Sequence, residues 1–287
     1  MADYLCNLIV PGAAKSGTSS LHRILGRHPN ITMSHPKEPQ FFSFDDLYSK
    51  GSKYHNSLFE HVDGDTVTYG ESSQSYFVHQ RAIDRIQKSL DKPKIIILLR
   101  DPLERLLSHY RWRYKLGVET RSLHKAVEES GLSTLYEYDK THNIYRAHGG
   151  YVAFSQYAKY VPMWINAFSK ENVLVLRTED LKNRQSVLSA ACFRFLGFQE
   201  ICVDETVHSH STSDVRRLTS RPPDWIRKGE TLIPAYIRES RLYGFARRQL
   251  IRALTLDHNK QVTDSVRRYL QDLLEPDIDF YKNVDPV

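Results

Sequence analysis

Cysteine is scarce in this chain of 287 residues, which contains only Cys6, Cys192 and Cys202. The three lie far apart in the sequence and show neither a disulfide framework nor the paired spacing of a zinc motif. We therefore expect isolated thiols in the core or on the surface. The sequence gives no reason to expect a metal site.

Long apolar runs are also missing. No stretch reaches the length of about 18 apolar residues that a membrane-spanning helix needs, so no such helix is predicted. The opening residues, MADYLCNLIV, lack the basic segment and the long apolar segment of a secretory signal peptide. We expect either a cytoplasmic protein or a chain trimmed of its targeting part.

Charge of one sign is in excess. The chain has a net charge of +6 at pH 7 and an isoelectric point near 9.1, which favours an anionic partner. No nucleic-acid-binding module is recognisable, so nucleic acid is not expected as a partner. Basic and aromatic residues alternate over 208–252, including Arg216, Arg217 and Arg221. This pattern predicts an amphipathic helix. Its basic side is either a solvated face or a functional surface, namely a lid, an acceptor-binding region or a peripheral membrane contact.

Strand-like and helical patterns alternate along the chain. The run KIIILL is uninterrupted and β-branched, as in a parallel strand buried on both faces. Such alternation predicts an α/β fold with a doubly wound parallel sheet, in one domain over 1–287. Pro162 is expected to kink or end the helix around it. The strands are predicted over 5–10, 67–69, 95–99 and 173–176, and the longest loops over 43–56 and 208–224.

The segment LIVPGAAKSGTSSLHRIL, residues 8–25, has the order of a P-loop-like strand, loop and helix. In the usual nucleoside-triphosphate loop a lysine directly follows the second glycine, but here Lys15 precedes Gly17 by two residues. Backbone amides from Lys15 to Ser19 and the hydroxyls of Thr18 and Ser19 can converge on an anion at the start of the helix. The alternative is a glycine-rich turn without a ligand.

The segment LLRDPLERLLSHY, residues 98–110, carries a second candidate site. Arg100 stands at the carboxyl end of the predicted central strand, where open α/β sheets bind ligands, and Ser108 lies about two turns into the next helix. A guanidinium and a hydroxyl suit a second phosphate. Alternatively, Arg100 pairs with a local carboxylate. A kinase would instead use Asp101 to hold magnesium.

The segment HPKEPQFFS, residues 35–43, carries a third. Lys37 and Glu38 stand between two prolines, and Phe41 and Phe42 follow. A carboxylate held in this way is a candidate general base. The alternative is an exposed charged turn pinned by the two phenylalanines.

Taken together, PGAAKSGTSSL, HPKEPQFFS, GESSQSYF, IILLRDPLERLLSHYRW and VLVLRTEDL resemble the sulfotransferases that use 3′-phosphoadenosine 5′-phosphosulfate (PAPS), above all the heparan-sulfate type and its bacterial relatives. The resemblance implies an O-sulfotransferase in which Glu38 is the general base and Lys15 contacts the bridging oxygen of the donor. It places the 3′-phosphate on Arg100 and Ser108 and requires no metal. It also implies that Gly17, Thr18 and Ser19 cradle the 5′-phosphate, with Ala14, Lys15 and Ser16 as further donor-binding residues.

The chain also departs from that family. Ser72 stands where the heparan-sulfate enzymes often carry a lysine, and we expect Lys37 to supply that charge. The family's closing loop has no clear match, so Arg216 and Arg217 are the candidates for covering the donor. Among the histidines, His35 and His109 are the alternative bases. The missing disulfide and membrane anchor favour a bacterial, cytoplasmic member.

The acceptor is the open question. A carbohydrate or glycolipid hydroxyl is favoured, with Phe41, Ser72 and Tyr76 as candidate acceptor-binding residues. A carrier-bound polyketide hydroxyl and a small-molecule hydroxyl are the alternatives, and an anionic or lipid-linked acceptor suits the net charge. Two further hypotheses differ in class: an ATP- and magnesium-dependent small-molecule kinase, and a nucleotide-binding protein without turnover.

Overall fold

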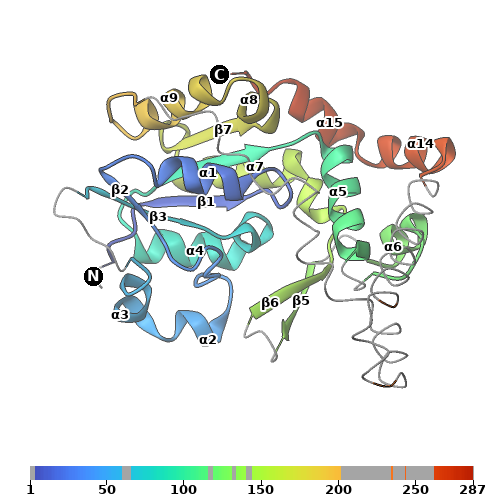
Figure 1. The fold of residues 1–287 in the computed structure, drawn as a ribbon, viewed down its shortest axis with the longest axis horizontal. Helices are drawn as coiled ribbons and strands as arrows, with labels where there is room; N and C mark the ends of the chain where they lie inside the picture. The colour runs from blue at the N-terminus through green and yellow to red at the C-terminus, as the bar shows by residue number, and fades with distance from the viewer. Residues whose placement is uncertain are drawn as a thin grey trace.

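The computed structural model of the chain describes residues 4–59, 66–115, 119–130, 134–139, 144–201, 234, 243 and 262–286 (Figure 1). Its centre is a five-stranded sheet with the order β2-β3-β1-β4-β7, in which every neighbouring pair is parallel. The strands are Leu8–Gly12 (β1), Ile31–Met33 (β2), Thr68–Ser72 (β3), Lys94–Leu99 (β4) and Val173–Arg177 (β7).

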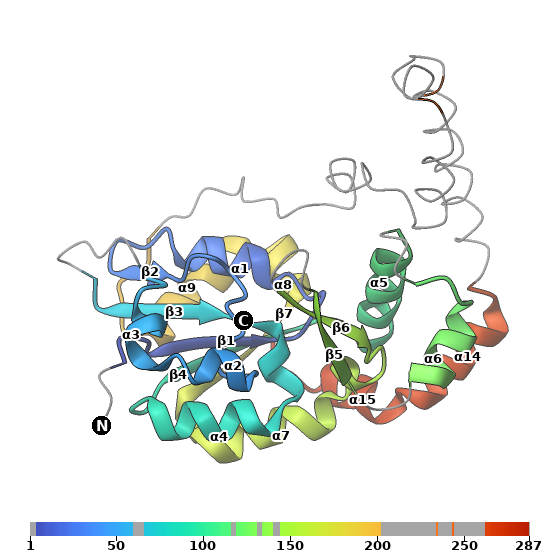
Figure 2. The ribbon, with the colours of Figure 1, turned by 90° about the horizontal axis from the view of Figure 1, so that it is seen from below.

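Helices cover both faces of this sheet (Figure 2). On one face lie α1 (Thr18–Leu25), α8 (Thr178–Asn183) and α9 (Gln185–Phe195); on the other lie α4 (Gln80–Ser89) and α7 (Tyr157–Phe168). Alternate residues of β4 serve the two faces: Ile96 and Leu98 pack towards α1 and α9, whereas Ile95 and its i+2 neighbours pack towards α4 and α7. This double burial explains the uninterrupted KIIILL run and confirms the doubly wound α/β fold.

A third group of elements flanks one end of the sheet. Apolar side chains of α5 (Pro102–Lys115), α6 (Leu123–Ser130) and α14 (Asp264–Leu273) form a separate cluster. The last helix, α15 (Glu275–Lys282), docks on α7, where the Asp277 carboxylate accepts a hydrogen bond of 2.9 Å from the Ala158 amide. The described residues also form an antiparallel hairpin of β5 (Thr134–Asp139) and β6 (Ile144–Gly149), and three short 3₁₀ helices, η1 (Gln74–Val78), η2 (Ala153–Ser155) and η3 (Lys170–Asn172).

Two local expectations are wrong. The predicted loop 43–56 contains two short helices, α2 (Asp45–Tyr48) and α3 (Gly51–Asn56), because the neighbouring aromatic residues are buried and hold this segment against the core. Pro162 does not end helix α7, which continues to Phe168, since the apolar face of the helix, including Val161 and Trp164, is buried on both sides of the proline.

Residues 208–252 lie outside the described residues, apart from Pro234 and Tyr243, so the proposed lid with Arg216, Arg217 and Arg221 is not placed. Within the described part of the chain, no helix has the length and apolar character needed to cross a membrane.

The strand order places a topological switch at the centre of the sheet. From β1 the chain passes to β2 and β3 on one side, and it then returns to β4 on the other side of β1. At such a point the loops that follow the two adjacent strands separate and leave a crevice at their carboxyl ends, which is where open α/β sheets bind ligands. Lys15 lies in the loop after β1, and Arg100 directly follows β4.

Candidate active site

The loop between β1 and α1 is bound tightly to its neighbours. The Ala13 amide donates to the Leu98 carbonyl at 2.8 Å. The Thr178 hydroxyl, at the start of α8, lies 2.5 Å from the Ser16 carbonyl oxygen and 2.8 Å from that of Leu99, so one side chain joins this loop to the end of β4. The loop is therefore a rigid element that holds its amides in place.

Gly17 is required where the loop enters α1. Its φ of 99° lies in the left-handed region, and a Cβ at this position would lie 3.0 Å from Leu181 Cδ2. The Thr18 and Ser19 amides at the start of α1 have no acceptor within the helix, whereas the Ser20 amide donates to the Gly17 carbonyl at 2.9 Å. The Ser16 hydroxyl is buried and has no hydrogen-bond partner among the described residues. Together these donors form a small cradle that suits an anion.

Lys15 extends from this loop to α5. Its ammonium lies 4.8 Å from the centre of the Trp112 ring, a favourable cation–π distance. Trp112 follows Ser108 by four residues and thus lies on the same face of α5. The lysine of the first predicted site therefore reaches the face of α5 that carries the serine of the second.

The side chains of Arg100 and Ser108 are available for a ligand. Both residues are partly exposed, and neither the guanidinium nor the hydroxyl has a hydrogen-bond partner among the residues that the structure describes. The expected alternative, an ion pair of Arg100 with Asp101, is not formed. Instead, Asp101 caps α5 by accepting a 2.8 Å hydrogen bond from the Glu104 amide.

The surroundings of this pair are strongly basic. Arg105 is fully buried and donates to the Ser155 hydroxyl at 2.6 Å. Burial lowers the pKa of Arg105 to about 10, with a smaller contribution from nearby Arg100. Burial and the nearby Arg105, Arg113 and Lys15 hold the pKa of His109 well below its usual range. His109 is therefore neutral and enclosed, which makes it a poor candidate for the base.

Glu38 lies near the end of β3 and is held by three contacts. Its amide donates to the Ser72 carbonyl at 3.0 Å, its Oε2 accepts from the Gln74 amide at 3.1 Å, and its Oε1 pairs with the Lys37 ammonium. The side chain is 24% exposed, so the carboxylate is oriented and still reachable. Ser73 donates its amide to the Val10 carbonyl at 3.2 Å, which ties the Glu38 segment to β1.

Lys15 and Glu38, two of the predicted catalytic residues, have a strained backbone. Their φ values are 68° and 64°, and the other described residues apart from glycine with a positive φ are Gln40 (55°), Lys92 (43°) and Ser169 (68°). A side chain in the left-handed region costs about 1–2 kcal/mol per residue and persists only where the surrounding structure enforces it. Residues strained in this way are common at functional sites.

The structure corrects the expectation for the acceptor-binding residues. Phe41 and Tyr76 are fully buried and Ser72 is 1% exposed, so none of the three presents a surface to an acceptor. The phenylalanine anchors its loop in the core, and the tyrosine hydroxyl bonds to Glu71 at 3.0 Å. The Ser72 hydroxyl lies 2.9 Å from His22 Nδ1.

His22, which contacts Ser72, does not supply a positive charge beside Glu38. Burial, with the nearby Lys37 ammonium next in importance, lowers the pKa of His22 to about 4, so its ring is neutral at pH 7. Lys37 supplies the positive charge beside Glu38.

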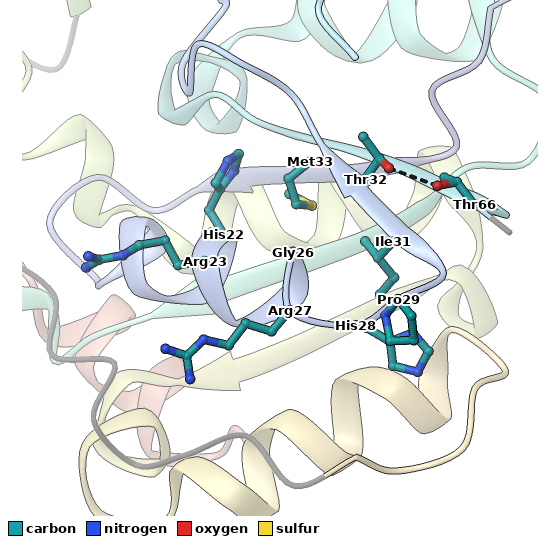
Figure 3. A pocket seen from close by; sticks show the side chains of 10 residues that line it. All are labelled: His22, Arg23, Gly26, Arg27, His28, Pro29, Ile31, Thr32, Met33 and Thr66. Carbon is teal, nitrogen blue, oxygen red and sulfur yellow. Dashed lines mark hydrogen bonds between the residues drawn. The ribbon is translucent and has the colours of Figure 1, made fainter. Parts of the chain in front are cut away.

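A groove of about 460 Å³ begins at His22 and runs beside the edge strand β2 (Figure 3). Its lining is polar and basic. The side chains of Arg23 and Arg27 lie on one side of the groove, and the hydroxyls of Thr32 and Thr66, which lie 3.0 Å apart, mark its far end. The other lining residues are Gly26, His28, Pro29, Ile31 and Met33.

Sequence reasoning missed several residues that shape the site. No role was predicted for Trp112, although its spacing from Ser108 indicates a shared helix face. Thr178 carries no motif of its own. Its role follows from the sheet order, which sets the end of β7 beside that of β4. Arg23 and Arg27 are four residues apart, a spacing that suggests one surface, but nothing in it points to a groove.

The fold and the loop after β1 define a P-loop-like α/β protein with an anion cradle at the start of α1. The family model described as the sulfotransferase domain matches residues 6–267, and the chain belongs to this family.

Two curated relatives and one solved structure are similar to the chain. It is 26% identical over 211 residues to the human heparan sulfate glucosamine 3-O-sulfotransferase 3B1 and 25% identical over 225 residues to the mouse bifunctional heparan sulfate N-deacetylase/N-sulfotransferase 1. These alignments cover 74% and 73% of this chain but 51% and 23% of the relatives. A sulfotransferase structure from Alicyclobacillus acidocaldarius matches with a TM-score of 0.60 and 27% identity, covering 75% of this chain and 90% of that one.

Proposed function

We propose that this chain is a PAPS-dependent O-sulfotransferase, with Lys15 and Glu38 as its catalytic residues. The observation that supports the proposal is that Lys15 and Arg100 follow the adjacent strands β1 and β4 at the switch point of the sheet, while the Lys15 ammonium reaches Trp112 on α5 and Glu38 is held near the end of β3. Family membership supports the general activity. The roles of individual residues are our inference.

The residues present fit the donor. Its two phosphate positions need two separate groups of donors. One is the cradle at the start of α1, with the unpartnered Ser16 hydroxyl, and the other is Arg100 with Ser108. PAPS supplies the transferable sulfuryl group. The 3′-phosphate site distinguishes this donor from ATP, because ATP carries no phosphate at that position.

The chemistry requires the acceptor oxygen, the sulfur and the leaving oxygen in line, as in phosphoryl transfer. Lys15 stabilises the charge that develops on the leaving oxygen, together with the amides of the loop. Glu38 accepts the proton of the acceptor hydroxyl as the oxygen bonds to sulfur. The pairing of Lys37 with Glu38 orients the carboxylate before the acceptor arrives.

We propose a carbohydrate or glycolipid hydroxyl as the acceptor, in an anionic or lipid-linked molecule. The basic groove beside β2 supports an anionic chain, since it starts at His22, which contacts the Ser72 side chain next to the Glu38 loop. Carrier-bound polyketide and small-molecule hydroxyls are the alternatives. Bacterial origin, cytoplasmic location and peripheral membrane contact stay predictions.

A kinase would need a carboxylate to hold magnesium at the end of β4. The Asp101 carboxylate there caps α5 through the Glu104 amide, which accounts for it structurally. A binding protein without turnover would need no oriented base, and the contacts of Glu38 favour an enzyme over that hypothesis.

A transfer assay tests the proposed activity. The chain is incubated with PAPS radiolabelled at sulfur and with a panel of acceptors: an unsulfated heparan-type oligosaccharide, a glycolipid and small alcohols. We expect label to move to the oligosaccharide or the glycolipid with formation of 3′,5′-diphosphoadenosine. Transfer of the γ-phosphate of ATP in a parallel reaction, with no sulfur transfer, would support the kinase instead.

Replacing Arg100 by Ala is expected to weaken binding of 3′,5′-diphosphoadenosine by about 10–100-fold. This corresponds to about 1.5–3 kcal/mol for a charged hydrogen-bond donor. Binding of 5′-AMP should change little, because it lacks the 3′-phosphate. Calorimetric titration of both nucleotides checks this, with Arg194→Ala as the control, since Arg194 is an exposed arginine paired with Glu200. Equal losses for both nucleotides would contradict the assignment.

Reversing the charges of the groove in an Arg23→Glu/Arg27→Glu variant is expected to raise KM for an anionic oligosaccharide acceptor about tenfold, or about 1.4 kcal/mol. The kcat should change little, because neither residue is part of the proposed catalytic site. Initial rates at varied acceptor concentration check this. Lys88→Glu on α4, which covers the opposite face of the sheet, is the control. An unchanged KM would place the acceptor elsewhere.

A further inference from the structure

A second cluster of reactive side chains lies away from the proposed active site, inside the core. It consists of Cys6, just before β1; His55, in α3; and Glu71, in β3. Their ligand atoms all lie within 4.8 Å of one another, and His55 Nε2 is 3.5 Å from Glu71 Oε1. The three residues are widely separated in sequence, so only the fold brings them together.

The cluster is fully enclosed and poorly satisfied. His55 and Glu71 have no exposed surface, and Cys6 is 3% exposed. Both ring nitrogens of His55 and Glu71 Oε2 are buried without a hydrogen-bond partner among the described residues. Buried polar groups are normally satisfied, and leaving one unpaired costs about 1–3 kcal/mol. Several such atoms close together in an enclosed core suit a ligand that they share.

An ion pair between His55 and Glu71 does not remove this deficit. A protonated ring would use one nitrogen towards Glu71 and leave the other buried N–H without an acceptor. The Glu71 carboxylate also accepts a 3.0 Å hydrogen bond from the Tyr76 hydroxyl on the oxygen that faces His55, whereas Oε2 stays unpaired. A cation bound by all three side chains satisfies a ring nitrogen and the carboxylate together. The Cys6 thiol, which donates a 3.5 Å hydrogen bond to the Leu8 carbonyl, would supply the third ligand atom.

We propose that Cys6, His55 and Glu71 bind a structural zinc ion. Thiolate, imidazole and carboxylate are the three ligand types that zinc takes in proteins. At bond lengths of about 2.0–2.3 Å, two ligands of a tetrahedral zinc ion lie about 3.3–3.8 Å apart, so the His55–Glu71 separation already fits and Cys6 needs only a small shift. The Tyr76 hydroxyl provides a further oxygen beside the cluster. Binding replaces the Cys6 thiol proton, which is released to solvent as the sulfur–zinc bond forms.

The site would brace the loop that carries Glu38. The rings of Phe41 and Phe42 lie 4.5 Å and 5.2 Å from the His55 ring, and the Phe42 amide donates to the Tyr76 hydroxyl at 3.1 Å. An ion bound by Cys6, His55 and Glu71 would link the segment before β1 to α3 and β3, next to the rings of Phe41 and Phe42. Its role is structural, so the inference does not depend on the proposed activity and adds no metal to the sulfuryl transfer.

The test uses the full chain, expressed in zinc-supplemented medium because a buried site loads during folding, and purified without a metal-affinity step. Elemental analysis is expected to find about one zinc ion per chain. Cys6→Ser, His55→Gln and Glu71→Gln should each lose most of it, while the control Cys192→Ser, at a second buried thiol that faces α1 and β1, keeps it. Removing the metal with a chelator should lower Tm in the wild-type chain and in the control.

Cobalt gives a second readout that does not depend on the ligand variants folding. Chain expressed with Co²⁺ should show a thiolate-to-cobalt charge-transfer band that persists in a Cys192→Ser/Cys202→Ser double variant, in which Cys6 is the only remaining thiol. Wild-type chain that holds no stoichiometric zinc or cobalt, with Tm unaffected by chelator, would overturn the proposal. Metal that stays bound in the Cys6→Ser variant, together with the absence of a thiolate-to-cobalt band, would also overturn it.

Discussion

Replacing Glu38 by Gln is expected to lower kcat by about 10²–10⁴-fold while leaving the affinity for 3′,5′-diphosphoadenosine nearly unchanged. The substitution keeps the shape of the side chain and its hydrogen bond from the Gln74 amide but removes the proton acceptor. Glu38 contacts Lys37 and the β3 end and is not part of the donor cradle. Single-turnover rates and calorimetric titration on the same preparation check the two parts of this prediction.

The control is Glu171→Gln, at an exposed carboxylate in η3, which should behave as the wild-type chain does. Two results would contradict the role of Glu38. A variant that retains full turnover would place the base elsewhere, and His35 would then be tested next. A variant that loses donor affinity together with turnover would show that Glu38 holds the structure of the site and does not accept the proton.

Replacing Lys15 by Ala is expected to lower kcat by about 10²–10³-fold, the effect of removing one donor that stabilises a developing oxyanion. Binding of the donor nucleotide should weaken as well, because a positive charge is lost beside two phosphate sites. The backbone of the loop should persist, since alanine bears the same cost of a positive φ as lysine and the hydrogen bonds of Thr178 and Ala13 do not involve this side chain.

Steady-state rates and donor titrations measure both effects, and Lys170→Ala provides a matched control at an exposed lysine in η3. Normal turnover in the Lys15 variant would remove the assignment of the loop. A loss of stability in Lys15→Ala, measured as a fall in Tm, would point instead to the contact of the lysine with Trp112.

The fold was largely predictable from the sequence because its strands carry strong local signals. The KIIILL run indicates a strand that is buried on both faces, and Gly17 indicates a left-handed backbone. Both signals are contained in a few residues that are neighbours in the sequence. The short strand β2 and the β5–β6 hairpin were not predicted. β2 has three residues, too few for a periodic pattern, and it pairs only with β3 at the edge of the sheet.

The candidate site was predictable in its ligand-facing residues and not in its supporting ones. Lys15, Glu38, Arg100 and Ser108 occur in motifs, and the structure brings Lys15 to the helix face of Ser108. Aromatic residues carry no such signal, since a ring that stacks on a sugar and a ring that fills the core look alike in sequence. Phe41 therefore proved to be a core residue. The Cys6, His55 and Glu71 cluster spans three distant segments, so spacing alone cannot reveal it.

We propose that the sheet's switch point binds a nucleotide with a 3′-phosphate. Calorimetric titration of the wild-type chain with 3′,5′-diphosphoadenosine and with ADP, each with and without magnesium, tests this binding most directly. We expect tight binding of 3′,5′-diphosphoadenosine that does not depend on magnesium, and much weaker binding of ADP. Preferential binding of ADP in the presence of magnesium would contradict it and would make Asp101 the next residue to replace.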